Sequence, residues 1–321
     1  MLNVEPLATD EYVRAVLPHS ASLWAEGRSL ERYVNDLKDL AKSGYGKRRF
    51  SMLGVRVNGD VATSLKRYER DLRCGERMLR AIGIGAVFTR PEYRGQGLAT
   101  AMLAALLDAE RKRGTDLAIL YSNIRPQFYE EIGFRVLPSR IFTVRADSLA
   151  FERIKPLHVR DDDWPAIARC FAALDELRAY ALHRTPLVWE LIRARHRIQP
   201  EPGHTVNLAI HAGRRILAYC LGRRVVKSDA FVVDEFSFAG PQHAHLIPPL
   251  LRSAAGDLRR ITGWLPPAPA RDALPRGTVR ARRDAILMVA PLSTIARARW
   301  KADARDLSRA ASDPVWSTDL M

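Results

Sequence analysis

The hydrophobic and polar residues in the first half of the chain follow helical and strand periods in turn. Thr9-Asp10-Glu11 is a helix-start signal, and Asn58-Gly59-Asp60 is a turn signal between two strands. The elements expected here are a strand at 3–8, helices at 9–26 and 29–42, strands at 49–57, 61–68 and 78–89, a helix at 98–113, a strand at 117–121, a short helix at 126–132 and one or two strands within 134–144.

The second half repeats this order of elements, which indicates an internal duplication. The elements expected here are a strand at 154–159, a helix with Pro165 at its start, a helix at 186–196, strands at 206–210, 216–226 and 231–238, a helix at 244–259, a strand at 261–265, a late strand at 281–290 and a helix at 295–311. A chain of 321 residues is long enough for two domains. We therefore expect α/β domains at residues 1–150 and 151–321.

Composition limits the class of protein. Hydrophobic residues make up 47% of the chain and charged residues 27%, which is ordinary for a globular protein. The longest apolar stretches, 81–88 and 101–107, are far shorter than the roughly 20 residues that cross a bilayer. The N-terminus also lacks the basic start and apolar core of a signal peptide. We expect a cytoplasmic protein with no membrane span.

The formal charge of +15 raises the question of a nucleic-acid partner. Only eight of the 51 basic residues are lysines, and the arginines are scattered in pairs such as Arg214-Arg215 and Arg259-Arg260. No basic run is interleaved with regularly spaced aromatic residues, as a surface that follows a nucleic-acid strand requires. We therefore expect no nucleic-acid partner. A positive field would still attract a small polyanion.

The turn after the strand at 78–89 carries the clearest chemistry. Gly95 and Gly97 lead into a helix whose first N–H groups are free, and such a spot favours an anion. Glycine lets the backbone come close to a phosphate. A Walker loop requires Lys and Ser or Thr after its last glycine, where this chain has Leu98-Ala99. A dinucleotide fingerprint fails because the third small residue is missing at Thr100.

The pattern that does fit is Gln/Arg-x-x-Gly-x-Gly/Ala, matched by Arg94, Gly97 and Ala99. About thirty residues later, the segment 123–134 ends in Tyr-x-x-x-Gly-Phe, with Tyr129 as its tyrosine. In both motifs, and at their separation, the chain resembles the GNAT superfamily of acetyl-coenzyme A dependent N-acetyltransferases. The close resemblance covers about residues 50–138.

This resemblance implies an α/β fold of the α+β layered kind. It consists of two tandem GNAT-like domains, each with a mixed, mostly antiparallel sheet flanked by helices. The second domain has Gly240-Pro241-Gln242 where the phosphate-binding turn should be, and proline has no N–H to offer a phosphate. We therefore expect the second domain to be a degenerate copy that shapes the acceptor cleft.

By the same resemblance, acetyl-coenzyme A (acetyl-CoA) is the co-substrate. The end of the strand would pair with its pantetheine arm, the turn would hold its pyrophosphate, and the second motif would complete the site. The residues expected to bind it are Val87, Phe88, Thr89, Arg94, Gly95, Gln96, Gly97, Leu98, Ala99, Thr100, Asn123 and Phe128.

Tyr129 matches the family's general-acid tyrosine. A tyrosine pKa near ~10 keeps the hydroxyl protonated at neutral pH, and transfer to a thiolate with a pKa near ~8.5 is roughly balanced. Candidates for the base that deprotonates the acceptor amine are Glu92, Asp234 and Glu235.

The chain also resembles tandem-domain relatives similar to the aminoglycoside-modifying acetyltransferases of the enhanced-intracellular-survival type. In those relatives the terminal carboxylate enters the active site. Here that role would fall to Met321, with Trp316 as the anchor of the tail.

No metal is expected. The pair His243-x-His245 lacks a third ligand at a suitable spacing. The run Asp161-Asp162-Asp163 stands at a helix start, where the helix dipole explains carboxylates.

The expected activity is transfer of the acetyl group to a primary amine of a small molecule or peptide, by direct attack on the thioester. Two alternatives stay open. One is an acyltransferase that uses another acyl chain or another acceptor, such as a hydroxyl. The other is an acyl-CoA binding or sensing module without turnover. The motifs identify the donor and leave the acceptor open.

Overall fold

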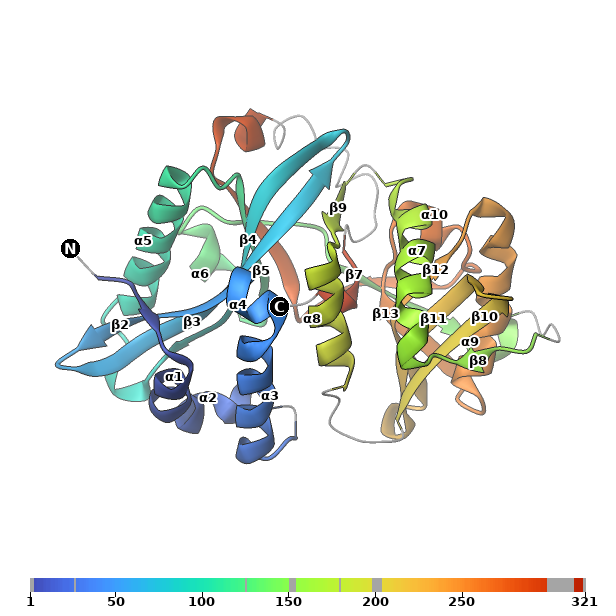
Figure 1. The fold of residues 1–321 in the computed structure, drawn as a ribbon, viewed down its shortest axis with the longest axis horizontal. Coiled ribbons are helices and arrows are strands. Elements are labelled where there is room, and N and C mark those ends of the chain that lie inside the picture. Colours follow the sequence, from blue (N-terminus) through green and yellow to red (C-terminus); the bar gives the residue numbers. More distant parts are fainter. Residues whose placement is uncertain are drawn as a thin grey trace.

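The computed structural model describes residues 3–25, 27–124, 126–149, 154–178, 180–197, 204–298 and 315–319. Two lobes lie side by side, and each is built on one mixed sheet with helices packed against it (Figure 1). The predicted fold class, α/β with two tandem layered domains, is confirmed.

The first lobe contains an eight-stranded sheet in the order β1-β2-β3-β4-β5-β15-β6, with β9 paired to β3. Its paired strands are antiparallel except β4 and β5, which run parallel. The strands are β1 (Glu5–Leu7), β2 (Phe50–Val57), β3 (Asp60–Cys74), β4 (Arg77–Thr89), β5 (Leu117–Ser122), β6 (Arg135–Val136), β9 (Tyr180–His183) and β15 (Ile286–Pro291).

The second lobe contains a seven-stranded sheet in the order β14-β7-β13-β12-β11-β10-β8. Its paired strands are antiparallel except β12 and β13, which run parallel. The strands are β7 (Arg140–Arg145), β8 (Leu157–His158), β10 (Thr205–Ala212), β11 (Arg215–Val225), β12 (Ala230–Phe238), β13 (Arg260–Trp264) and β14 (Thr278–Ala281).

The two halves of the chain exchange one strand. When the second sheet is read from β8 to β14, its order matches the first sheet read from β1 to β6, and β7 takes the place that β15 has in the first. β7 pairs antiparallel with β13, and β15 pairs antiparallel with β5. This matching order supports the predicted duplication. The division between the sheets does not coincide with the predicted domain boundary at residue 150.

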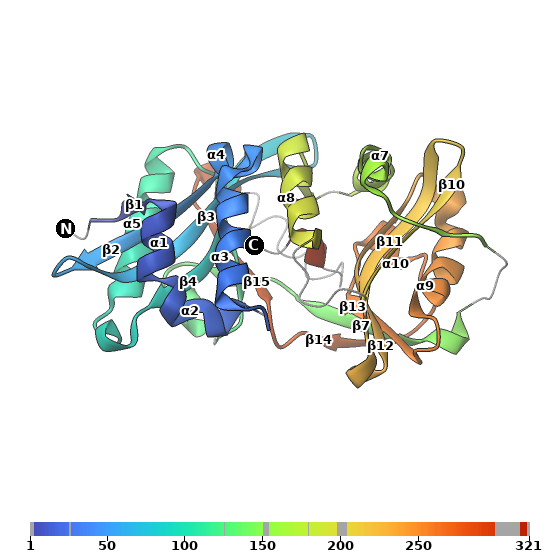
Figure 2. The same cartoon turned by 60° about the horizontal axis from the view of Figure 1, so that its bottom comes forward.

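Helices cover both faces of the first sheet. Tyr12, Leu17 and Leu37 of the first three helices pack in one buried cluster, and Met102, Leu106 and Tyr129 pack in another. The helices are α1 (Thr9–Ala15), α2 (Leu17–Trp24), α3 (Leu30–Lys42), α4 (Gly44–Arg49), α5 (Leu98–Lys112), α6 (Gln127–Glu130), α7 (Trp164–Asp175), α8 (Pro186–Arg197), α9 (Ile247–Ala255) and α10 (Ala268–Arg271). Both views place α8 between the lobes (Figures 1 and 2). None of these helices combines the length and hydrophobicity needed to cross a bilayer.

Several predicted elements need correction. The helix predicted at 9–26 is two helices that meet at Val16, because Pro18 in the first turn of α2 has no N–H to donate to the preceding turn. α4 and β9 were not predicted. β3 continues past the predicted end at Tyr68. The prediction stopped there because the run Glu69-Arg70-Asp71 is polar, although Arg70 is buried in the structure.

The last part of the chain also differs from the prediction. The late strand expected at 281–290 is two strands, β14 and β15, which lie in different sheets. The predicted helix at 244–259 is shorter, because Pro241–Leu246 form a 3-10 turn before α9. Most of the helix predicted at 295–311 falls outside the described residues.

Candidate active site

The turn between β4 and α5 presents unpaired backbone donors. Gly95 and Gly97 have φ of 76° and 72°, a conformation that strains residues with a Cβ. In the described chain, none of the N–H groups of residues 95–100 has a backbone acceptor within hydrogen-bonding geometry. These donors lie at the positive end of the 15-residue helix α5, so the turn can accept an anion. The N–H of Arg94 is already used, because it donates to the carbonyl of Pro91 at 3.2 Å.

The end of β4 has one open edge. Parallel pairing with β5 extends only to Ile84, opposite Leu120, whereas pairing with β3 continues to Thr89. Between these points the register shifts, and Ala86 has a φ of 48°. The bulge turns the strand away from β5, and residues 85–89 can offer backbone groups to an amide-rich ligand. The pairing of Val87, Phe88 and Thr89 with pantetheine stays a prediction.

Two carbonyls at this strand end already have partners. The Phe88 carbonyl accepts a hydrogen bond from Thr63 Oγ1 at 2.9 Å, and the Thr89 carbonyl accepts one from Arg94 Nε at 3.1 Å. The Arg94 guanidinium also lies 5.9 Å from the centre of the Phe88 ring. Arg94 therefore fixes the geometry between the strand end and the turn.

Tyr129 lies in α6, and 8% of its surface is exposed. It belongs to the buried cluster that also contains Ile84 of β4, and Val87 packs against this cluster. Burial raises the pKa of the Tyr129 hydroxyl to about 12. The side chain is therefore protonated at neutral pH, as expected, but it is a weaker acid than the sequence alone indicated.

The other two residues predicted from the second motif shape this region. Asn123 is exposed at the end of β5, and its side-chain carbonyl accepts the N–H of Ala285 at 2.7 Å. This bond ties β5 to the entry of β15. Phe128 is half-buried and packs edge-on against Tyr129, with ring centres 4.9 Å apart. Their contact with the coenzyme stays a prediction.

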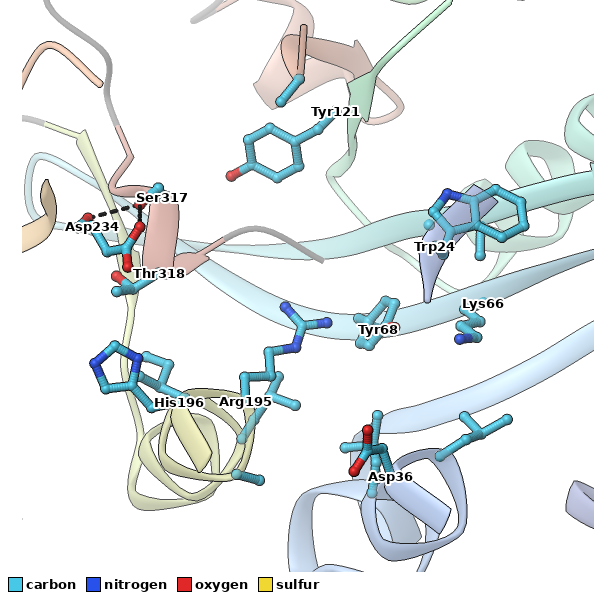
Figure 3. A pocket seen from close by; sticks show the side chains of 18 of the residues that line it. Trp24, Asp36, Lys66, Tyr68, Tyr121, Arg195, His196, Asp234, Ser317 and Thr318 are labelled. Atoms are coloured by element: carbon cyan, nitrogen blue, oxygen red, sulfur yellow. Dashed lines mark hydrogen bonds between the residues drawn. The ribbon is translucent and has the colours of Figure 1, made fainter. Parts of the chain in front are cut away.

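A cavity of about 560 Å³ lies between the two lobes. The first lobe contributes α2, α3, β3 and the β4 bulge at Gly85 and Ala86. The second contributes α8, β12 and the turn at Ser317 and Thr318 (Figure 3). Because the bulge directly precedes the residues predicted to pair with pantetheine, the cavity adjoins the predicted position of the acyl group.

The three predicted bases lie in different surroundings. Glu92 is exposed in the turn before α5 and forms an ion pair with Arg90. Glu235 is fully buried and is held 2.7 Å from Arg184. Asp234 does line the cavity. Of these candidates, Asp234 alone is placed to reach an acceptor there.

The described end of the chain is anchored in the second lobe. Trp316 is buried, and its ring centre lies 5.2 Å from that of Phe236. The Asp319 carboxylate lies 3.0 Å from Arg184 Nε. Trp316 thus anchors the tail as predicted. Met321, whose carboxylate was predicted to enter the active site, is outside the described residues.

The residues considered for metal binding have other partners. Nδ1 of His245 lies 2.9 Å from the carbonyl oxygen of Gln242, and Asp163 accepts the N–H of Arg160 at 2.8 Å. Within the described ranges, no three His, Cys, Asp or Glu side chains are grouped so that they could hold a metal ion.

Sequence reasoning missed two cations that line the cavity, Lys66 on β3 and Arg195 on α8. Lys66 follows the apolar and small residues 61–65, so a charged residue at an inward position of a strand was the available signal. Arg195 gave no such signal, because it is one of many arginines on amphipathic helices.

The comparisons with known proteins agree with this geometry. The family described as an acetyltransferase (GNAT) domain matches residues 7–137. No curated protein matches this chain.

Among solved structures, a GCN5-related N-acetyltransferase from Anabaena variabilis has a TM-score of 0.72 at 15% identity, covering 92% of this chain and 74% of that one. A probable N-acyltransferase from Enterococcus faecalis has a TM-score of 0.71 at 13% identity, covering 91% and 73%. A tandem GNAT protein from the clavulanic acid biosynthesis pathway has a TM-score of 0.53 at 13% identity, covering 91% and 99%.

The second lobe lacks the phosphate-binding turn. Gly240 has a φ of 141°, and Pro241 opens a 3-10 turn where the first lobe has its glycine turn. Residues 7–137 therefore match the GNAT acetyltransferase domain family, and the chain as a whole has the fold of a tandem GNAT protein.

Proposed function

We propose that this chain transfers the acetyl group of acetyl-CoA to a primary amine. One juxtaposition carries the proposal: the open end of β4, beside the glycine turn, borders the cavity between the lobes at Gly85 and Ala86. The turn and the strand edge suit the phosphates and the amides of the coenzyme. The cavity gives the acceptor access from the other side of the thioester.

In the proposed reaction the amine nitrogen attacks the thioester carbon. The carbon–nitrogen bond forms, the carbon–sulfur bond breaks, and the sulfur leaves as a thiolate. Tyr129 donates its proton to the sulfur. The amine loses its proton to Asp234 or to water, and solvent restores the proton of Tyr129. Because the pKa of Tyr129 is about 12, its hydroxyl hydrogen-bonds to the sulfur as charge develops and transfers the proton late.

A binding experiment tests the donor half of this proposal. Acetyl-CoA at about 100 times its Kd should raise the unfolding free energy by about 2.7 kcal/mol. Gly97→Asp should abolish the shift by placing a carboxylate against the phosphates, whereas Gly97→Asn has a similar size without the charge and should keep most of it. A Cβ at position 97 would meet nothing within 4 Å, and Asp and Asn are among the residues that tolerate a positive φ best, so both variants should fold with a similar strain. No shift with any acyl-CoA would contradict the donor assignment.

A turnover experiment separates the enzyme from its alternatives. Release of free thiol with an amine pool, followed with acyl chains of different length, reports both catalysis and chain preference. We expect acetyl-CoA to be used best. Binding without any thiol release would favour a sensing module, and faster release from a longer acyl-CoA would favour another acyltransferase.

A further inference from the structure

Three cationic side chains surround Tyr68 at the cavity between the lobes. Lys66 and Arg70 stand two residues to either side of Tyr68 on β3, so all three share one face of the strand. Arg195 reaches Tyr68 from α8, with its guanidinium 5.5 Å from the ring centre, and Lys66 lies on the far side of Tyr68 (Figure 3). We call Lys66, Arg70 and Arg195 the cation cluster.

No member of the cation cluster has an acidic partner among the described residues. The Lys66 ammonium, 7% exposed, donates to Tyr33 Oη at 3.2 Å and faces the rings of Tyr12 and Tyr33. All three guanidinium nitrogens of Arg70 are buried without a hydrogen-bond partner. Arg195 forms no ion pair within the described ranges. Such buried cations are costly unless an anion joins them.

The carboxylates that line the same cavity are committed elsewhere or exposed. Asp36 lies 2.9 Å from Arg28, and Asp234 lies 3.4 Å from Arg223. Asp284 is exposed on the segment before β15. The excess positive charge of the cavity therefore stays on Lys66 and Arg195.

The rest of the lining is largely aromatic and aliphatic. Trp24, Tyr68 and Trp264 line the cavity together with Leu37 and Ile192. A volume of about 560 Å³ falls within the range of small-molecule sites. The cavity thus combines apolar side chains with two cations that have no acidic partner among the described residues, beside the bulge where acyl transfer is proposed.

We propose that the acceptor is an amine that also carries a carboxylate on an aromatic or aliphatic body, and that Arg195 binds the carboxylate while Lys66, across Tyr68, adds positive charge. A monoanion would partly neutralise the two cavity cations that have no acidic partner among the described residues, while Arg70 adds positive potential. The amine would then face Gly85 and Ala86. The amine part rests on the proposed function, whereas the carboxylate site can be tested without catalysis.

The direct test compares two unreactive ligands of equal shape on the whole protein, 3-phenylpropionate and its neutral amide, 3-phenylpropanamide. Calorimetric titration should show the carboxylate binding at least about tenfold more tightly. Arg195→Met should remove that preference, and Arg195→Lys should keep part of it. Arg193→Met is the matched control, because Arg193 lies on the same helix, pairs with Asp161 and does not line the cavity. Equal affinity, no binding of the carboxylate, or an unchanged preference in Arg195→Met would overturn the proposal.

A second arm separates this proposal from the proposed function. Wild type and Arg195→Met are assayed for acetyl transfer to phenylalanine and to phenylalaninamide. The ratio of kcat/KM for the two acceptors should fall by about tenfold in Arg195→Met, and comparing ratios between proteins cancels the different basicity of the amines. Carboxylate binding without transfer to any amine would leave the site standing and refute the acetyltransferase. Transfer with an equal ratio in both proteins would refute the carboxylate site and leave the acetyltransferase standing.

Discussion

Replacing Lys66 with methionine should stabilise the protein near neutral pH and lose that advantage as the pH rises. Burial, followed by the charges of Arg195 and Arg28, lowers the pKa of Lys66 from 10.5 to about 7. Asp36 of α3, which lines the same cavity, is already paired with Arg28. The difference between the two pKa values means that Lys66 lowers the unfolding free energy by at most about 5 kcal/mol.

The sign follows from proton binding. Between about pH 7 and pH 10.5 the unfolded chain holds a proton on Lys66 that the folded chain has lost, so this residue makes stability rise with pH across that window. In Lys66→Met the contribution is absent. We expect the variant to be more stable than wild type by about 2–4 kcal/mol at about pH 7, and the difference to shrink by about 3 kcal/mol by about pH 10.

Urea unfolding of both proteins across this pH range provides the measurement. Lys112→Met is the control, because Lys112 is exposed on α5 and surface substitutions change stability by about 0.5 kcal/mol or less. If wild type and Lys66→Met show parallel pH profiles, Lys66 keeps its proton in the folded protein across this range, and burial does not lower its pKa.

Three other predictions test separate parts of the structure. Tyr129→Phe should lower kcat by about tenfold or more with little change in KM for acetyl-CoA, and an unaltered kcat would remove the role of Tyr129 as acid. Because the pKa of Tyr129 is about 12, its hydroxyl stays protonated up to about pH 10. Any fall in the wild-type rate below that pH should therefore also occur in Tyr129→Phe. Removing residues 320–321 leaves the anchored turn in place and tests the terminal carboxylate, and full activity would refute its participation. Residues 1–150 expressed alone should fail to unfold cooperatively, because the first sheet then lacks β15 and its buried Leu287, Met288 and Val289, whose burial contributes about 1.5–3 kcal/mol each; a cooperative, acetyl-CoA-binding fragment would contradict the strand exchange.

The glycine turn and most helices were predictable because their signals are local. Ser29 caps α3 where expected, accepting the N–H of Arg32 at 3.2 Å. The two glycines of the turn, which were expected to let the backbone approach a phosphate, adopt a positive φ. In such cases a few neighbouring residues determine the conformation, and tertiary contacts only confirm it.

The strand exchange was not predictable, because it depends on contacts between distant segments. β7 and β15 are both short strands that pair antiparallel beside the parallel pair of a sheet, so their own patterns do not say which sheet each joins. The cavity was hidden for the same reason. Lys66 and Arg195 are far apart in sequence, and the packing of α8 between the lobes brings them together.

The central claim is that the chain transfers an acetyl group from acetyl-CoA to an amine. Incubation with isotope-labelled acetyl-CoA and an amine library, analysed by mass spectrometry, tests it most directly. Wild type and Gly97→Asn should form a labelled amide and an equal amount of free coenzyme thiol, and Gly97→Asp should form neither. Binding of acetyl-CoA with no labelled amide from any amine would contradict it.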